Sequence, residues 1–189
     1  MSEVRVVRRM TLEMLRGMGR LEDGVLVGEE TMLRVGRSGF ALSYLPLPKA
    51  VWRSFPPASG ALPEQVLRAD KGAVFGAWEG DRIIGLACIR MGSAGWAELV
   101  DIRVDAAHRR CGIARMLLDA CDRFAAEQGA RGIRLEASEA NPVLCQFCEH
   151  TGFVLHGLDR MALVYTEAER SKPMARRACA LYFYRLCGA

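Results

Sequence analysis

The sequence lacks several features that would assign it to a specialised class of protein. No apolar run approaches the ~18 residues of a membrane-spanning helix, and Met1 to Thr11 carries arginines without the apolar stretch of a secretory signal. The 7 cysteines are odd in number and scattered, which is not the pattern of a disulfide framework. The sequence has no internal repeat and no low-complexity segment. We therefore expect a cytoplasmic protein that does not bind a membrane.

A strong charge imbalance is also missing. The formal net charge is only +4, from 26 basic and 22 acidic residues that alternate along the chain. A nucleic-acid-binding protein concentrates its basic residues, so we expect no nucleic-acid partner. The chain has 189 residues, of which 51% are hydrophobic and 25% are charged. This predicts a folded protein with a single domain over residues 1–189.

Residues 1–72 are predicted to contain N-terminal helices and a proline-rich loop. Helical periodicity interrupted by glycines predicts helices over Met10 to Met18 and around Glu29 to Val35. Leu45 to Pro63 contains five prolines and is predicted to be a loop or insertion that faces the substrate.

Residues 73–189 alternate between strand and helix patterns. Ala73 to Trp78 and Arg82 to Arg90 predict a hairpin, and Trp96 to Val104 predicts a third antiparallel strand. Apolar residues at three- and four-residue spacing predict a helix from Ile113 that ends near Gln128. The remaining predictions are a helix over Asn141 to Thr151 and strands over Gly132 to Ala137, Phe153 to Leu155, Met161 to Tyr165 and Arg176 to Leu186.

The most informative segment is the turn Arg109-Arg110-Cys111-Gly112-Ile113-Ala114, between a predicted strand and a predicted helix. Amides at the start of a helix have no partner within the helix, and the helix dipole favours an anion there. Gly112 allows close approach of the backbone, and the arginines add charged donors. The turn therefore suits a phosphate, although a basic turn that caps an ordinary helix is an alternative interpretation.

The turn and its surroundings resemble the GNAT superfamily of N-acetyltransferases over about Ala73 to Leu186. The turn is similar to the pyrophosphate signature of that family, and Asp101 to Val104 resembles its bulged central strand; Asn141 and Gly152-Phe153 fall at the family spacing. The resemblance implies an α/β fold of the α+β type, with a mixed, mostly antiparallel central sheet flanked by helices. It also implies that residues 73–189 form an acetyl-CoA-binding core with C-terminal strands. The cofactor-binding residues implied are Ile102, Arg103, Val104, Arg109, Arg110, Cys111, Gly112, Ile113, Ala114, Arg115 and Asn141. His108 adjoins the turn and is a further candidate contact.

A narrower resemblance is to streptothricin acetyltransferases. It rests on Asp101-Ile102, Leu135-Glu136, Asn141, Asp159, the tail Leu181 to Arg185 and, upstream, Leu42-Ser43-Tyr44. It implies a small-molecule amine as substrate, with Glu136, Asp159 and Tyr182 as substrate-binding residues, and it allows a homodimer. The long proline-rich segment leaves room for a different or broader substrate. Two alternatives stay open: acetylation of a protein lysine or N-terminus, and an acyl-CoA sensor or inactive interaction module.

Transfer of an acetyl group requires a neutral amine, and an alkyl ammonium is mostly protonated at pH 7. A carboxylate beside the amine can accept its proton. By resemblance the first candidate is Glu98, which matches the catalytic glutamate of some family members, and the second is Asp101, which matches the streptothricin subfamily. Cys148 replaces a tyrosine that protonates the leaving thiolate in many family members, and is a candidate proton donor. Cys145 and Cys148 form a Cys-x-x-Cys pair, but no second pair completes four zinc ligands, so we expect no metal.

Overall fold

The computed structural model describes residues 5–22, 24–37, 39–55, 57, 60–161 and 178–188. The chain divides into two compact units, which are described separately below. The first unit comprises Met1–Gly24, Ser59–Arg134 and Leu186–Ala189, and the second comprises Val25–Ala58 and Leu135–Arg185. Whether residues 1–189 behave as one domain stays a prediction.

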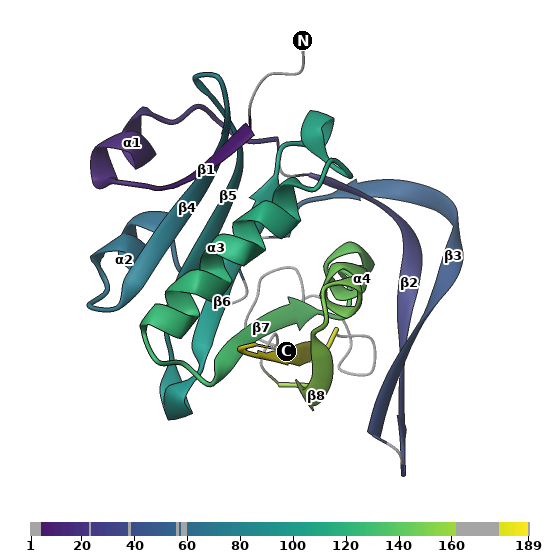
Figure 1. Ribbon diagram of the computed structural model, residues 1–189. Coiled ribbons are helices and arrows are strands. Elements are labelled where there is room, and N and C mark those ends of the chain that lie inside the picture. Colours follow the sequence, from purple (N-terminus) through teal and green to yellow (C-terminus); the bar gives the residue numbers. More distant parts are fainter. Residues whose placement is uncertain are drawn as a thin grey trace. The chain divides into compact units, whose positions relative to one another are not determined.

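The first unit is built on four antiparallel strands in the order β1-β4-β5-β6 (Figure 1). Their bounds are Arg5–Arg9 for β1, Gly72–Glu79 for β4, Arg82–Met91 for β5 and Ala97–Val104 for β6. The middle of β5, from Ile83 to Ile89, is buried throughout. The predicted hairpin and third antiparallel strand are therefore confirmed.

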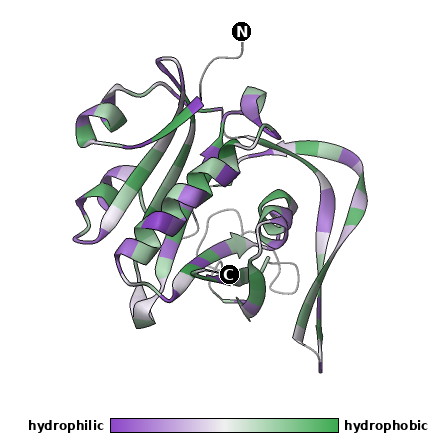
Figure 2. Ribbon diagram, in the orientation of Figure 1, coloured by the Kyte–Doolittle hydropathy of each residue, from purple (hydrophilic) through white to green (hydrophobic). Residues whose placement is uncertain are grey.

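Helices cover both faces of this four-stranded sheet. The short helices α1 (Leu12–Gly17) and α2 (Pro63–Arg68) pack on the side that Leu86 and Cys88 face. The longer helix α3 (Ile113–Glu127) packs against β4, β5 and β6 on the other side. A Cβ at Gly85 would lie 3.0 Å from both Ile113 and Leu117 side chains, so the glycine lets α3 lie close to β5. Figure 2 shows the hydrophilic residues of α3 along its outer face, as the periodicity predicts.

The second unit contains a long hairpin, β2 (Val25–Gly36) and β3 (Gly39–Arg53), and three strands in the order β7-β9-β8. The bounds are Gly132–Ser138 for β7, of which Leu135 onward belongs to this unit, Val154–Asp159 for β8 and Ala180–Leu186 for β9. Helix α4 (Pro142–His150) begins after Asn141, whose side chain accepts from the Leu144 amide at 3.1 Å. The helix predicted over Asn141 to Thr151 is confirmed.

Two polar contacts join the hairpin to α4. The Tyr44 hydroxyl donates to Glu149 at 2.6 Å, and the Gln146 amide donates to Glu29 at 2.6 Å. Burial and the Glu149 hydrogen bond raise the pKa of Tyr44 well above its usual value. The hairpin is thereby fixed against one face of α4.

Three predictions for the N-terminal part of the chain are wrong. Glu29 to Val35 is strand rather than helix, because the segment pairs with β3, from Glu29 opposite Pro46 to Val35 opposite Phe40. The proline-rich segment is not a loop up to Arg53, since Pro46 lies within β3 opposite Glu29. Proline is tolerated in a two-stranded sheet, where each strand has an open edge. The prediction of helices alone also omitted strand β1.

Other predictions are confirmed in part. The helix over Met10 to Met18 corresponds to α1, and the strand from Phe153 corresponds to β8. Of Met161 to Tyr165 only Met161 is described, and residues 176–177 of the last predicted strand lie outside the described residues, which show β9 from Ala180. No helix within the described ranges is both long and apolar enough to cross a membrane.

Candidate active site

The predicted phosphate turn is a left-handed bend at the start of α3. After β6 the chain forms a short 3-10 helix, η2 (Ala106–His108), and then bends at Arg110 and Gly112, with φ of +61° and +81°. Glycine adopts this conformation without steric cost, whereas a side chain at Arg110 is held there under strain. A Cβ at Gly112 would meet nothing within 4 Å, so the space beside this residue is open.

The first amides of α3 are available to a ligand. The Met116 amide is the first to bond into the helix, to the Gly112 carbonyl at 3.1 Å, so the amides of residues 113–115 precede the helical ladder. Gly112, the N-cap residue, offers no side-chain acceptor. Among the described residues, none accepts a hydrogen bond from these three amides. Unpaired amides at the positive end of a 15-residue helix form an anion site.

The Arg109 side chain holds the turn in place. Its guanidinium donates to the carbonyl oxygens of Val104 at 3.0 Å, Gly24 at 2.7 Å and Glu22 at 3.2 Å. It therefore ties the end of β6 to the segment that precedes β2. The sequence pattern did not predict this role, because two of the three partners are 85 and 87 residues away.

Replacement of Arg109 by methionine, which keeps an unbranched aliphatic stem but removes the guanidinium donors, should destabilise the protein. Three hydrogen bonds from a charged group are lost, and partly buried carbonyls lose their donors. We therefore expect the free energy of unfolding to fall by about 2–4 kcal/mol. Urea denaturation followed by circular dichroism measures this. Arg110→Met is the matched control, because Arg110 is exposed and keeps the same backbone. Equal stability of the two variants would contradict this role of Arg109 in holding the turn.

A bulge in β6 brings the two candidate bases to the same face of the sheet. Cys88 of β5 faces Asp101 and Arg90 faces Glu98, with Val100 as the extra residue of β6. Cys88 and Arg90 are two residues apart and share a face, so their partners Glu98 and Asp101 do so as well. Without the bulge, residues three apart on a strand would face opposite sides.

The two carboxylates differ in how they are held. Glu98 accepts from Arg134 on Oε1 at 3.0 Å and from Arg90 on Oε2 at 3.3 Å. A Cβ at Gly92 would lie 2.5 Å from the Glu98 side chain, so this glycine provides its space. The Asp101 side chain accepts from Arg103, and both bonds fall on Oδ2. Both oxygens of Glu98 are thus occupied by guanidinium groups.

The second unit holds the other predicted site residues. Asp159 and Tyr182 lie on one face of the paired strands β8 and β9, where Asp159 faces Ala180 and Tyr182 faces Gly157. Asp159 accepts from the Met161 amide at 2.7 Å, and Glu136 lies on the neighbouring strand β7. Asn141 serves as the N-cap of α4. Their roles toward a substrate or cofactor stay predictions.

The Cys-x-x-Cys pair lies on the packed face of α4. Cys145 and Cys148 both have 0% exposure, and Cys145 Sγ donates to the Ser138 carbonyl at 3.7 Å. Burial raises the pKa of Cys145 to about 12 and that of Cys148 well above its usual value. Both thiols therefore remain protonated at neutral pH and pack as small apolar groups. A catalytic role of Cys148 stays a prediction.

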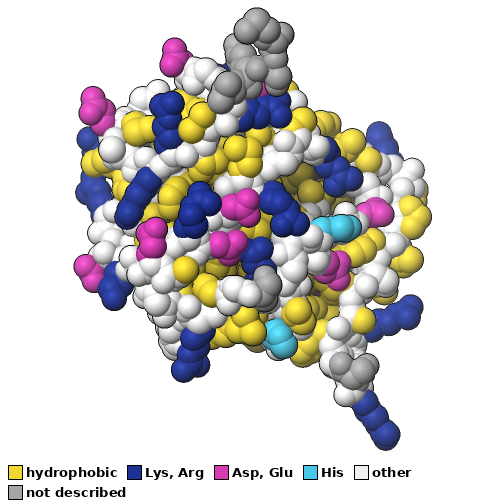
Figure 3. All heavy atoms as spheres, viewed as in Figure 1, with side chains coloured by type: hydrophobic (Ala, Val, Ile, Leu, Met, Phe, Trp, Pro, Cys, Tyr) yellow, Lys and Arg dark blue, Asp and Glu magenta, His cyan; other side chains and the backbone are white. Residues whose placement is uncertain are grey.

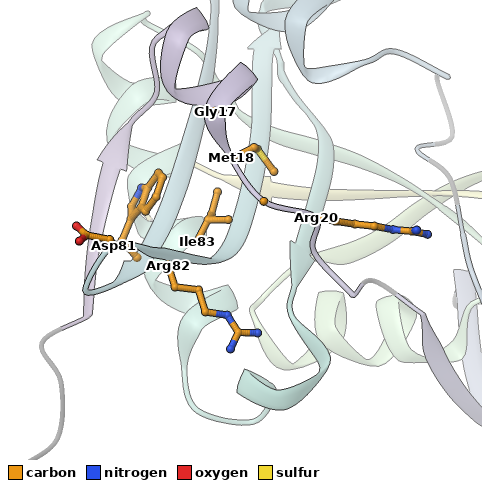
Figure 4. Close-up of a pocket in the computed structure, with 8 residues that line it drawn as sticks. Gly17, Met18, Arg20, Asp81, Arg82 and Ile83 are labelled. Carbon is orange, nitrogen blue, oxygen red and sulfur yellow. The ribbon is translucent and has the colours of Figure 1, made fainter.

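The surface adds two observations. A pocket of about 260 Å³ in the first unit contains none of the predicted site residues (Figure 4). It is lined by Gly17, Met18, Gly19, Arg20, Trp78, Asp81, Arg82 and Ile83.

On the face seen in Figure 3, basic and acidic side chains are interspersed, as the alternating charges of the sequence predict.

Comparison with known proteins identifies the family. Residues 43–153, more than half of the chain, match the profile of the acetyltransferase (GNAT) family. The chain therefore belongs to this family and is an acetyltransferase by class, and its mixed, mostly antiparallel sheet flanked by helices is the predicted fold.

Solved structures share this fold over the full length. A candidate streptothricin acetyltransferase from Bacillus anthracis, in complex with acetyl coenzyme A, has a TM-score of 0.83 and 22% identity, with 97% of this chain and 99% of that chain covered. Nourseothricin acetyltransferase has a TM-score of 0.77 and 21% identity, with 97% and 98% covered. Ard1 from Thermoplasma volcanium has a TM-score of 0.63 and 16% identity, with 98% and 99% covered. A search of proteins with curated functions gives no match.

Proposed function

We propose that this acetyltransferase binds acetyl-CoA at the start of α3 and transfers the acetyl group to a primary amine of a small cationic molecule. The observation that carries the proposal is the left-handed turn at Arg110 and Gly112, which leaves the amides of residues 113–115 without protein acceptors. A diphosphate needs several converging donors and close approach of the backbone. The open space at Gly112 fits that need.

Acetyl-CoA supplies an acetyl group activated as a thioester. In our proposal the α3 amides and the exposed side chains of Arg110 and Arg115 bind the diphosphate. The main chain of Ile102 to Val104 binds the pantetheine arm as a strand binds a neighbour, and an amide there donates to the thioester carbonyl. Arg109 contributes through the shape of the turn, because its guanidinium is bonded to three carbonyls.

For the proton of the amine we propose Asp101 as the first acceptor and Glu98 as the second. An ammonium that approached Glu98 would have to displace Arg134 or Arg90 from the oxygen it needs. Asp101 is paired with Arg103, and it is the carboxylate that matches the streptothricin subfamily. A carboxylate is also the natural partner of a cationic substrate, which its charge attracts before it accepts a proton.

For the substrate we propose a streptothricin-type antibiotic, so that acetylation would inactivate it and give resistance. The support is the full-length likeness to two structures that are named as streptothricin and nourseothricin acetyltransferases. Glu136, Asp159 and Tyr182 are the proposed substrate-binding residues. We place the reaction in the cytoplasm, where the chain's thiols stay reduced.

Release of the CoA thiol in the presence of different amines tests the proposal. We expect the highest kcat/KM with streptothricin and lower values with aminoglycosides, polyamines and peptides that have a free N-terminus or lysine. Calorimetric binding of acetyl-CoA is measured in parallel. Preference for a peptide would replace the small-molecule proposal with protein acetylation. Tight binding of acetyl-CoA without thiol release from any amine would identify a sensor.

A further inference from the structure

We infer that His108 is a positioning residue, which in its protonated form links the phosphate turn to strand β4 and so strengthens the binding of acetyl-CoA at acidic pH. The inference rests on the proposed function of the turn. It concerns residues of the first unit only. From the sequence alone, His108 is only a candidate contact to the cofactor.

The His108 ring lies between two carboxylates. Its Nδ1 is 3.0 Å from Asp105 Oδ1, and its Nε2 is 3.2 Å from Glu79 Oε2. The three side chains are shielded from solvent, with exposures of 13% for His108, 5% for Asp105 and 21% for Glu79. Two contacts at hydrogen-bond distance on opposite sides of one ring fix its position.

The chemistry of the ring makes this arrangement depend on charge. A neutral imidazole has one N–H donor, whereas an ionised carboxylate only accepts. Both contacts can be hydrogen bonds only when His108 carries two N–H groups and a positive charge. Loss of the proton removes one of the two bonds and leaves a lone pair facing a carboxylate oxygen.

The charged groups around the ring alternate in sign. Arg5 of β1 donates to Glu79 at 2.9 Å, and Arg82 of β5 lies 3.4 Å from Asp105. The order Arg5, Glu79, His108, Asp105, Arg82 is therefore positive, negative, positive, negative, positive when the ring is protonated. With a neutral ring, the two carboxylates face each other across an uncharged group.

The two carboxylates are held in their ionised form. The hydrogen bond from Arg5 lowers the pKa of Glu79, and the His108 ring adds to this effect. Burial alone would raise the pKa of Asp105, but His108, the Ala107 amide and Arg82 outweigh it, and the pKa is lowered. With both carboxylates ionised, the second proton of the His108 ring decides whether both contacts are hydrogen bonds. The link is present while the ring is protonated and is lost with that proton.

The network reaches the phosphate turn through Asp105. Asp105 accepts from the Ala107 amide at 3.2 Å and begins η2, while its own amide donates to the Ile84 carbonyl of β5 at 3.0 Å. The network thus joins three strands to the segment that presents the α3 amides.

Replacement of His108 by glutamine tests the inference, because the amide keeps a donor but carries no charge. We expect Kd for acetyl-CoA, measured by calorimetry, to rise about 5- to 20-fold at pH 6 and much less at pH 7.5, with kcat within about threefold of the parent. Amide hydrogen exchange of residues 105–115, measured without ligand, should be faster in His108→Gln at pH 6. Comparison with the parent at each pH removes the titration of the ligand itself. His156→Gln, an exposed histidine on β8, is the matched control and should match the parent.

Glu79→Gln is the second variant and should reproduce the weaker binding at pH 6, since it keeps an acceptor but removes one of the two negative charges that stabilise the protonated ring. If acetyl-CoA binds the parent and His108→Gln with the same Kd at both pH values, His108 does not position the turn and the inference fails. If the parent binds neither acetyl-CoA nor CoA, the proposed function fails; the hydrogen-exchange comparison then decides separately whether His108 orders the turn.

Discussion

Asp101→Asn is expected to lower kcat for the best amine about 100-fold near neutral pH, with KM for acetyl-CoA nearly unchanged. Asparagine has the same shape and still accepts from Arg103, but it cannot take a proton from the amine. The rate should recover as the pH rises and free amine becomes available without a base. The pH profile of thiol release measures all three effects.

Glu98→Gln is the matched comparison, because Glu98 shares the face of the sheet with Asp101. Its carboxylate is bonded to Arg90 and Arg134, so the variant should lose stability while kcat stays within about threefold. A larger fall of kcat in Glu98→Gln than in Asp101→Asn, with recovery at high pH, would assign the base to Glu98.

Gly112→Ala is expected to weaken acetyl-CoA binding about 10- to 100-fold. Alanine at a φ of +81° is strained by about 1 kcal/mol, and its methyl group would occupy the open side of the bend that the diphosphate approaches. Calorimetry with acetyl-CoA measures the loss, and thermal unfolding without ligand measures the strain alone.

Gly129→Ala provides the control for strain. Gly129 follows the end of α3, has a φ of +69°, and a Cβ there would also meet nothing within 4 Å. The two variants should lose similar stability, but Gly129→Ala should bind acetyl-CoA like the parent. Equal losses of affinity in both would show that the bend at Gly112 is not the diphosphate site.

The features predicted correctly from the sequence depend on neighbours in the chain. The apolar stripe of α3 and the position of α4 after Asn141 are both set within a few residues, where local periodicity applies. The segment Glu29 to Val35 shows the limit of such rules. Its composition suits helix and strand alike, and pairing with β3 decides for strand.

The site residues show the same limit. The bulge at Val100 cannot be derived from the local alternation of β6, because it depends on the register with β5, yet it brings Glu98 and Asp101 to one face. The partners of Arg109 and of His108 come from distant segments, so the sequence predicted a charged turn without the contacts that hold it.

The left-handed backbone of Arg110 has a kinetic consequence. A residue with a side chain is strained by about 1–2 kcal/mol in this conformation, and the strain is present in the free protein, where Arg109 and the Asp105 cap hold the bend. If the turn binds the diphosphate as proposed, the ligand meets a surface that has already adopted its binding shape. Encounter with an anion then requires no slow rearrangement of the turn, and its rate depends on diffusion and ionic strength. Some variants of this turn will leave the bend intact. Their differences in affinity should therefore come from the dissociation rate constant of the ligand.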